Sequence, residues 1–291
     1  MFCRLTLFRR PQTWVFLGIV LLGLGLRFTD LTDPPLDFHP MRQLRGALIA
    51  RSMYYQMLPG ADPAMRQKAI ETTAILERQE PPIFERLVAF TYLAVGGEYL
   101  WIARLYSILF WTVGGLFFFD LARRMTANGT SVSLGGHPVH GALAALAYYL
   151  LLPFAVTASR TFQPEPFMTM WIAITLWVAY HWGETHCGRD GRPWRWSIAT
   201  GLLAGWTLLV KVTAVYYLAP TLVVIVLTHW GLRQALRDLR VWAAAFLTTL
   251  IPASYYFFSI GSDSANWFSA WGLSFSYQLL QPRFYVIWLK F

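Results

Sequence analysis

Side chains of different chemistry stand close together in the stretch DFHPMR, which holds Asp37, His39 and Arg42. Asp37 is suited to act as a base toward a hydroxyl group, and Arg42 to bind a phosphate or carboxylate through parallel hydrogen bonds. Pro40 suits the first turn of a helix, whose free N–H groups attract anions at this point. The stretch therefore fits transfer of a group from a phosphate-linked donor, in which positive charge stabilises the leaving phosphate.

These residues also have structural interpretations. Asp37 can cap a turn in a Pro-rich connection, which is the role we expect of Asp30 and Asp33. His39 can cap the following helix or lie at a membrane interface. Arg45 is expected to face solvent or lipid headgroups. Both interpretations stay open at this point.

Other ionisable residues are expected on the same side of the chain's membrane topology. Glu80 precedes two prolines and is the second acidic candidate, the alternative being a carboxylate that stabilises a helix start. The link SRTFQPEP carries Arg160 and Glu165, which can face the same cavity as Asp37. Lys211 lies between two apolar segments; it is a candidate phosphate contact, or else a lysine that reaches toward the interface.

The elements that must position these residues are apolar. The chain has 291 residues, of which 56% are hydrophobic and 13% charged, whereas soluble domains carry about 25% charged residues. Its 14 Trp and 14 Tyr fit aromatic belts at two membrane interfaces. The composition predicts an all-α membrane protein that crosses the bilayer several times.

The net charge of +9 does not indicate nucleic-acid binding. Lys and Arg gather in short links between apolar runs, where the positive-inside rule places them in the cytoplasm. These cytoplasmic segments are residues 1–13, 122–137, 183–196 and 229–240. Cys3 and Cys187 both fall in them, so we expect no disulfide, and no metal-binding Cys spacing is present.

About seven spans follow from the length of the apolar runs. They are residues 14–28, 99–121, 141–158, 166–182, 197–210, 213–228 and 241–258. The first run lacks a small-residue cleavage site, so it is interpreted as a retained span with a cytoplasmic N-terminus, not as a signal peptide. Residues 84–95 are interpreted as an interfacial segment, because a full span there would put Arg123 and Arg124 outside.

This topology places residues 30–83 in the first outer loop, with helices expected at about 40–57 and 63–78 lying at the interface. Residues 1–258 then form one transmembrane module, and 259–291 begin a C-terminal part that is expected to be truncated. Arg104 falls inside a predicted span, where an ionisable residue faces a cavity or a partner. We expect it to pair with Glu98 or Glu85.

The chain also resembles the GT-C glycosyltransferases, membrane enzymes that use polyprenyl-phosphate-linked sugars. The likeness is to the bacterial branch related to protein O-mannosyltransferases and to lipopolysaccharide-core galacturonosyltransferases. It is carried, in order, by DFHPMRQLRGALIARSMYY, EPPIFERLVAFTYLAVGGEYLWIARLYSILFWTVGGLFFFDLARR, SRTFQPEPFMTMW and GLLAGWTLLVKVTAVYYLAP. The resemblance implies a module of seven spans with two interfacial helices in its first outer loop.

The resemblance also implies roles for particular residues. The acidic residue of the first outer loop is catalytic, and Asp37 occupies its place. Arg42 and Gln43 match the loop's Arg-Gln pair, and Glu80 matches the acidic residue before the proline. Many relatives carry paired acidic residues at the catalytic position, whereas Phe38 and His39 follow Asp37 here. A divalent cation, held by Asp37 and Glu80, is therefore left open.

We hypothesise an inverting transfer of a sugar from a polyprenyl-phosphate donor to a glycan, lipid or protein acceptor at the outer face of a bacterial inner membrane. Asp37 would be the general base and His39 would orient it. Phosphate and substrate contacts would come from Arg42, Gln43, Arg160, Glu165 and Lys211. The alternatives are a transporter or lipid flippase and an inactive assembly subunit. Against transport, the charges gather on one side and no inverted repeat is visible.

Overall fold

The computed structural model describes residues 11–76, 80–127, 138–187, 193–258, 277–278 and 280–288. All regular secondary structure in these ranges is helical. Within them, 3 helices are long and apolar enough to cross a membrane: Pro11–Phe28, Leu100–Ala127 and Val212–Trp230. The predicted class, a helical integral membrane protein, is confirmed, and the count of seven spans stays a prediction. Of the predicted C-terminal part, 259–291, only residues 277–278 and 280–288 are described.

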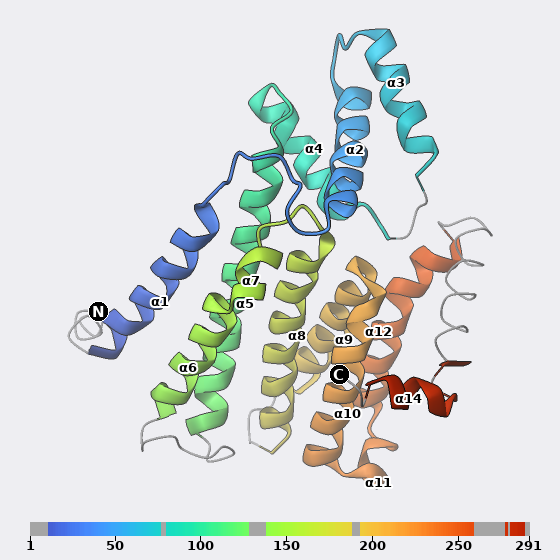
Figure 1. Cartoon of the computed structure of the whole chain (residues 1–291). Helices are drawn as coiled ribbons and strands as arrows, with labels where there is room; N and C mark the ends of the chain where they lie inside the picture. Colours follow the sequence, from blue (N-terminus) through green and yellow to red (C-terminus); the bar gives the residue numbers. More distant parts are fainter. Residues whose placement is uncertain are drawn as a thin grey trace, which may run out of the picture.

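Helices follow one another along the chain (Figure 1). They are α1 (Pro11–Phe28), α2 (Pro40–Met57), α3 (Pro63–Ala74), α4 (Ile83–Val95), α5 (Leu100–Ala127), α6 (Pro138–Leu151), α7 (Pro153–Ala158), α8 (Pro164–Cys187), α9 (Pro193–Val210), the 3₁₀ turn η2 (Val212–Ala214), α10 (Val215–Trp230), α11 (Leu232–Ala235), α12 (Leu239–Phe258) and α14 (Pro282–Trp288).

Proline begins α1, α2, α3, α6, α7, α8, α9 and α14, as expected of a residue whose missing N–H is not needed in a first turn. The helix predicted at 40–57 is confirmed. The helix predicted at 63–78 begins at Pro63 but ends at Ala74, and Arg78 lies outside the described residues. The span predicted at 141–158 is divided between α6 and α7, because Pro153 cannot continue a helix and holds Leu152 extended at φ −59°, ψ 128°.

The bundle is built by close packing of its neighbouring helices. α9 packs on both α8 and α12, α8 on α5, and α5 on α6. At the α9–α12 contact a Cβ on Gly201 would lie 2.7 Å from the Ala244 carbonyl oxygen, and one on Gly205 2.6 Å from that of Leu247. Only glycine allows the two backbones to approach so closely.

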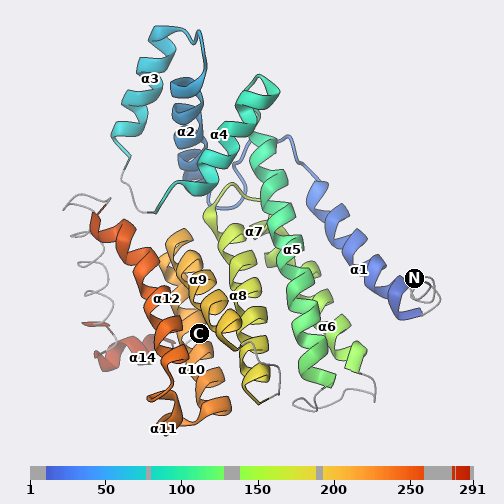
Figure 2. The ribbon, with the colours of Figure 1, turned by 180° about the vertical axis from the view of Figure 1, so that it is seen from behind.

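The helices of the first loop gather at one end of the bundle. Figures 1 and 2 show α2, α3 and α4 together at the end opposite α11, with α4 leading into the long α5. The connection between α7 and α8 reaches the same end. The residues singled out in the sequence are therefore brought to one end of the bundle.

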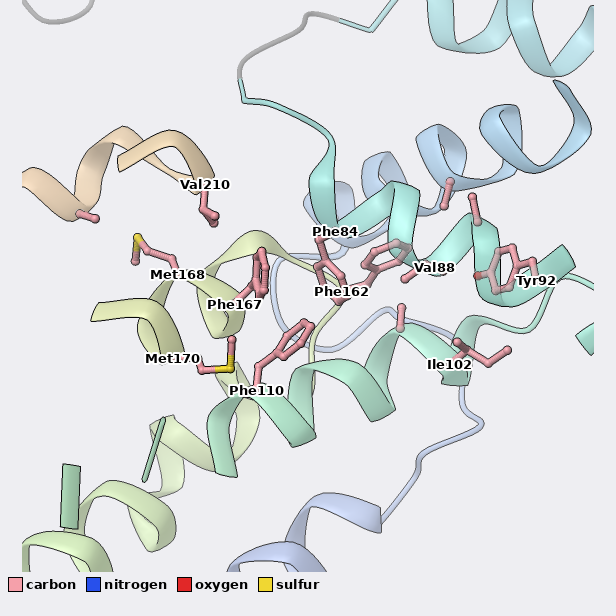
Figure 3. Packing of buried hydrophobic residues seen from close by; sticks show 14 of the residues in the cluster. Phe84, Val88, Tyr92, Ile102, Phe110, Phe162, Phe167, Met168, Met170 and Val210 are labelled. Carbon is pink, nitrogen blue, oxygen red and sulfur yellow. The ribbon is translucent and has the colours of Figure 1, made fainter. Parts of the chain in front are cut away.

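An aromatic cluster fixes α4 against this end (Figure 3). Phe84 of α4 is 2% exposed. Its ring lies 5.1 Å from Phe162 of the α7–α8 connection and 5.4 Å from Phe110 of α5, between ring centroids. Val88 and Tyr92 continue the buried face at helical spacing. α4 is therefore packed into the molecule through one face, and the first-turn residues beside Phe84 are held in place.

Candidate functional site

Asp37 lies between cations that come from distant parts of the chain, Arg104 in α5 and Arg160 in the α7–α8 connection. Its Oδ1 accepts a hydrogen bond from Gln43 Nε2 at 2.9 Å, and its Oδ2 accepts one from Arg160 Nη2 at 3.3 Å. Arg104 Nη2 lies 3.6 Å from Oδ1. We call this group, Asp37 with Gln43, Arg104 and Arg160, the Asp37 centre.

Gln43 locks two connections together from the first turns of α2. It is fully buried. Its Nε2 also donates to the Phe38 carbonyl oxygen at 2.8 Å, and its Oε1 accepts from the Phe162 backbone N–H at 3.2 Å. One amide thus fixes Asp37, the residue after it, and the α7–α8 connection at once.

Arg104 is buried in α5, with 3% of its side chain exposed. Besides pairing with Asp37, it donates to the carbonyl oxygens of Asp30 at 2.6 Å, Leu31 at 3.3 Å and Pro34 at 3.4 Å. The predicted pairing of Arg104 with Glu98 or Glu85 is wrong. The turn after α1 supplies both a carboxylate and carbonyl oxygens to the guanidinium, while Glu98 pairs with Arg51 on α2 at 3.6 Å.

A second buried arginine at this end was not singled out in the sequence. Arg27, in the last turn of α1, is fully buried. It donates to Ser159 Oγ at 2.6 Å and to the Leu150 carbonyl oxygen at 2.8 Å. Arg27 therefore fixes α1 against the residue beside Arg160. The signal was an arginine inside an apolar run, and such residues usually have a partner in the protein.

The surroundings of Asp37 keep its carboxylate ionised. Burial alone raises the pKa of Asp37, but hydrogen bonds from Gln43 and from the Phe38 N–H, with the charge of Arg104 and the hydrogen bond from Arg160, bring it below its ordinary value of 3.8. A carboxylate with these partners is a base that carries its charge throughout the neutral range.

His39 lies at the N-cap of α2 in the left-handed region, at φ 50° and ψ 60°. Its ring contacts that of Phe38, with centroids 4.4 Å apart. No hydrogen bond joins His39 to Asp37, whose orienting contacts within the described residues come from the Phe38 N–H and the other members of the Asp37 centre. The proposed orienting role of His39 stays a prediction.

The second charged group is built around Lys211, which follows α9. Its Nζ donates to Glu80 Oε1 and to Glu165 Oε1, each at 2.9 Å. Arg42 Nη1 reaches the same Glu165 oxygen at 2.9 Å. Burial lowers the pKa of Lys211, but the two carboxylates outweigh it and bring that pKa above its ordinary value. Lys211 is therefore a permanent cation.

A cleft opens beside Lys211, between the start of α2, the start of α4 and the α7–α8 connection. Its charged lining residues are Arg42, Arg45, Glu80, Glu85, Glu165 and Lys211. Phe84, Phe162 and Phe167 supply part of its apolar wall. We call it the Lys211 cleft.

The predicted single site is therefore divided into neighbouring parts. Arg42, Glu80, Glu165 and Lys211 line the cleft, whereas Asp37 belongs to the Asp37 centre and is not among the lining residues. The first two turns of α2 join the parts, since neighbouring residues 42 and 43 face the cleft and Asp37 respectively. Arg160 pairs with Asp37 and also donates to the Thr29 carbonyl oxygen at 2.8 Å, so its contact with a phosphate stays a prediction.

The residues considered for a divalent cation do not fit one. Asp37 and Glu80 belong to different groups, and each already accepts from cationic side chains or an amide. Among the described residues, no three His, Cys, Asp or Glu side chains are grouped so that they could hold a metal ion. The positive charge beside the cleft is supplied by Lys and Arg side chains.

Fold and site together define an integral membrane protein with a charged, cleft-bearing centre at one end of its helical bundle. Residues 79–258 match the family model described as dolichyl-phosphate-mannose-protein mannosyltransferase. The match covers more than half of the 291 residues, so the chain belongs to this family of GT-C membrane glycosyltransferases. The matched segment begins just before Glu80 and includes all residues of the Lys211 cleft except those of α2. Comparisons with curated proteins and with solved structures gave no match.

Proposed function

We propose that this protein transfers a sugar from a polyprenyl-phosphate-linked donor to a hydroxyl group of an acceptor, at the end of the bundle that carries the Asp37 centre and the Lys211 cleft. Family membership suggests a donor in which a lipid phosphate carries the sugar. The observation that carries the proposal is that cations line a cleft next to an ionised carboxylate. Phosphate binding and hydroxyl activation need these two features side by side.

The donor phosphate is proposed to bind in the Lys211 cleft. An ammonium group has three N–H donors, and Glu80 and Glu165 use two of those of Lys211. The third remains for a phosphate oxygen. Arg42 lies on the same Glu165 oxygen, which holds both cations beside one another. The other Glu165 oxygen, Oε2, is buried without a hydrogen-bond partner among the described residues and is suited to accept a hydroxyl of the sugar.

Asp37 is proposed as the general base. Its lowered pKa keeps it ionised, and its hydrogen bonds fix the direction of the carboxylate. In an inverting transfer the acceptor oxygen attacks the anomeric carbon from the face opposite the phosphate while Asp37 takes the hydroxyl proton. The leaving polyprenyl phosphate keeps the electron pair of the broken bond.

The sidedness is proposed from the charge distribution. The opposite end of the bundle carries Arg123 and Arg124 at the end of α5 and Arg233 in α11. Basic residues favour the cytoplasmic side, so the site would face the outer side of a bacterial inner membrane. Seven spans would then be α1, α5, the pair α6–α7, α8, α9, α10 and α12.

The experiment is turnover of labelled polyprenyl-phosphate sugars by the purified full chain in lipid nanodiscs, with a panel of hexose, hexuronic acid and pentose donors. Wild type should release polyprenyl phosphate from at least one donor when acceptor-containing membrane extract is added. Asp37→Asn should lose on the order of 10²–10⁴ of this rate, the usual contribution of a general base. Full turnover by a normally expressed Asp37→Asn would contradict the role of Asp37.

A further inference from the structure

Glu85 is a carboxylate in the Lys211 cleft that the proposed mechanism does not yet use. Of the three glutamates lining the cleft, Glu80 and Glu165 each accept a hydrogen bond from Lys211. Glu85 forms no ion pair and no hydrogen bond with another side chain in the described ranges. Its carboxyl oxygens are therefore open to a ligand that enters the cleft.

The position of Glu85 is fixed by the packing of α4. It follows Phe84, the buried ring that holds the first turn of α4 to the α7–α8 connection and to α5. This side chain therefore points from a rigid element, and its direction does not depend on a mobile loop. A catalytic group needs such support to hold its geometry.

Several charged groups share the cleft with Glu85. They are Arg42 and Arg45 of α2, Glu80 before α4, Glu165 of α8 and Lys211 after α9. Burial raises the pKa of Glu85 to about 7; its own backbone N–H, Arg45 and Lys211 act in the opposite direction, and Glu80 adds to the rise. Below neutral pH the carboxyl therefore holds a proton beside the cations of the cleft, and at neutral pH about half of it is protonated.

We propose that Glu85 is a further catalytic residue, which donates its proton to the leaving phosphate while Asp37 takes the proton of the acceptor hydroxyl. This inference rests on the proposed function. The bond between the anomeric carbon and the phosphate oxygen breaks, and that oxygen takes both the electron pair and the proton of Glu85. The acceptor oxygen forms the new bond to the anomeric carbon, and its proton goes to Asp37. Water then takes the proton from Asp37 and returns one to Glu85.

The chemistry favours a neutral carboxyl at this place. An ionised Glu85 would repel the phosphate, whereas a protonated one can donate a hydrogen bond to it. The second pKa of a phosphate monoester is about 6, close to that of Glu85, so the proton transfer is nearly balanced in energy. Asp37 and Glu85 have environments that push their pKa values apart, which is the pattern of an acid and a base sharing one reaction.

The test is binding of farnesyl phosphate, and of its methyl diester, to the full chain in phosphatidylcholine nanodiscs across the neutral pH range. The diester keeps one charge at every pH, so its profile reports the protein alone. We expect wild-type affinity for the diester to fall about tenfold as the pH rises through the pKa of Glu85. Coupling that shifts this pKa by about one unit corresponds to a tenfold change in affinity. Glu85→Gln should abolish this fall and keep tight binding at alkaline pH.

Glu98→Gln is the matched control, because Glu98 lies at the same end of the bundle but pairs with Arg51 outside the cleft. Its profile should follow wild type. The turnover rate of Glu85→Gln should be about 10²-fold below that of wild type, within the range for loss of a general acid. The wild-type rate should fall at alkaline pH, and this fall should be absent in Glu85→Gln.

The outcomes separate the inference from the proposed function. Absence of binding of both probes by wild type at every pH would contradict the proposed function itself. Binding with the same pH profile in wild type and Glu85→Gln would overturn the role of Glu85 alone. If Glu85→Gln does not fold, Glu85→Asp replaces it: a shifted midpoint of the binding profile supports the inference, and an unchanged midpoint overturns it.

Discussion

The Asp37 centre and the Lys211 cleft have inverted charge arrangements. In the first, one carboxylate lies among two arginines and an amide, and the supporting side chains Arg104 and Gln43 are 3% and 0% exposed. In the second, one lysine lies among three glutamates, and its outer cation, Arg42, is 62% exposed. The first is built into the fold, while the second is open to a ligand. We therefore expect charge at the Asp37 centre to hold structure as well as to react, and charge in the cleft mainly to bind.

The same difference separates the protonation states of the two regions. Cations and an amide lower the pKa of Asp37, whereas burial away from any ion pair raises the pKa of Glu85 to about 7. Two carboxyl groups at one end of a bundle thus have opposite protonation states between the pKa of Asp37 and that of Glu85. The comparison predicts that substitutions in the first region cost stability and those in the second cost ligand binding.

The largest expected effect on stability comes from Arg104→Met. It removes one of the two cations that pair with Asp37, together with the hydrogen bonds that Arg104 donates to the carbonyl oxygens of Asp30 and Leu31. Breaking a buried ion pair costs about 3–5 kcal/mol, and since Asp37 is partly exposed we expect about 3 kcal/mol of unfolding free energy. The measurement is the thermal unfolding midpoint of the purified chain, which should fall clearly.

Arg51→Met is the control for this variant, because Arg51 pairs with Glu98 at 3.6 Å and its side chain is 42% exposed. Its midpoint should stay close to that of wild type. Equal midpoints for wild type and Arg104→Met would break the comparison, since the Asp37 centre would then not be a structural unit.

The next effect is expected from Gln43→Met, a change of similar shape. It removes the hydrogen bonds to Asp37 and to the Phe38 carbonyl oxygen, and it leaves the buried N–H of Phe162 without an acceptor. A buried donor without a partner costs about 1–3 kcal/mol. The midpoint should fall by less than in Arg104→Met, and turnover should fall as well because Asp37 loses its orientation. Loss of turnover with an unchanged midpoint would show that Gln43 orients Asp37 without stabilising the fold.

Much of this architecture follows from local sequence, and the site follows from it only in part. Pro40 predicted the start of α2, and apolar run length predicted α5, because both signals lie within the element itself. The break at Pro153 had a local signal too, but the hydrophobic run extended across it. Arg104 was expected to pair within its own neighbourhood, whereas its partners lie in the turn after α1.

Glu85 shows why the remaining part of the site escaped the sequence. Its neighbours in the chain, Phe84 and Arg86, give no sign of a cleft. Burial against α2 and the groups of the cleft sets its protonation, and those contacts join segments far apart in the chain. Sequence could identify which residues carry charge, but their division into two groups depended on which side of α2 each of them faces.

A smaller effect is expected in the pH dependence of stability. The pKa of Glu85 rises from an ordinary 4.5 to about 7 on folding, so the folded state binds more protons between these values. The contribution of Glu85 to folding stability therefore decreases as the pH rises from 4.5 to about 7, and it is constant above that range. Asp37 contributes in the opposite sense, but only below its ordinary pKa of 3.8. There, acidification protonates the carboxylate and removes its contribution to the stability of the folded state.

The measurement is the thermal midpoint of wild type, Glu85→Gln and Glu98→Gln at several pH values from about 5 to about 8, a range in which the two carboxyl groups are separated. The difference between wild type and Glu85→Gln should change up to neutral pH and then stay constant. A constant difference over the whole range would contradict a proton held by Glu85 in the folded state.

The smallest effect on stability is expected from Arg42→Gln, and it tests the other half of the comparison. The pair of Arg42 with Glu165 is largely exposed, and exposed pairs contribute about 0–1 kcal/mol. The midpoint should hardly move, while affinity for farnesyl phosphate should fall about tenfold, since a charged hydrogen bond is worth about 1.5–3 kcal/mol. Arg51→Gln, on the same helix but outside the cleft, should change neither. If Arg42→Gln destabilised the chain as Arg104→Met does and bound the probe as wild type does, the cleft would be a second structural centre and not a binding site.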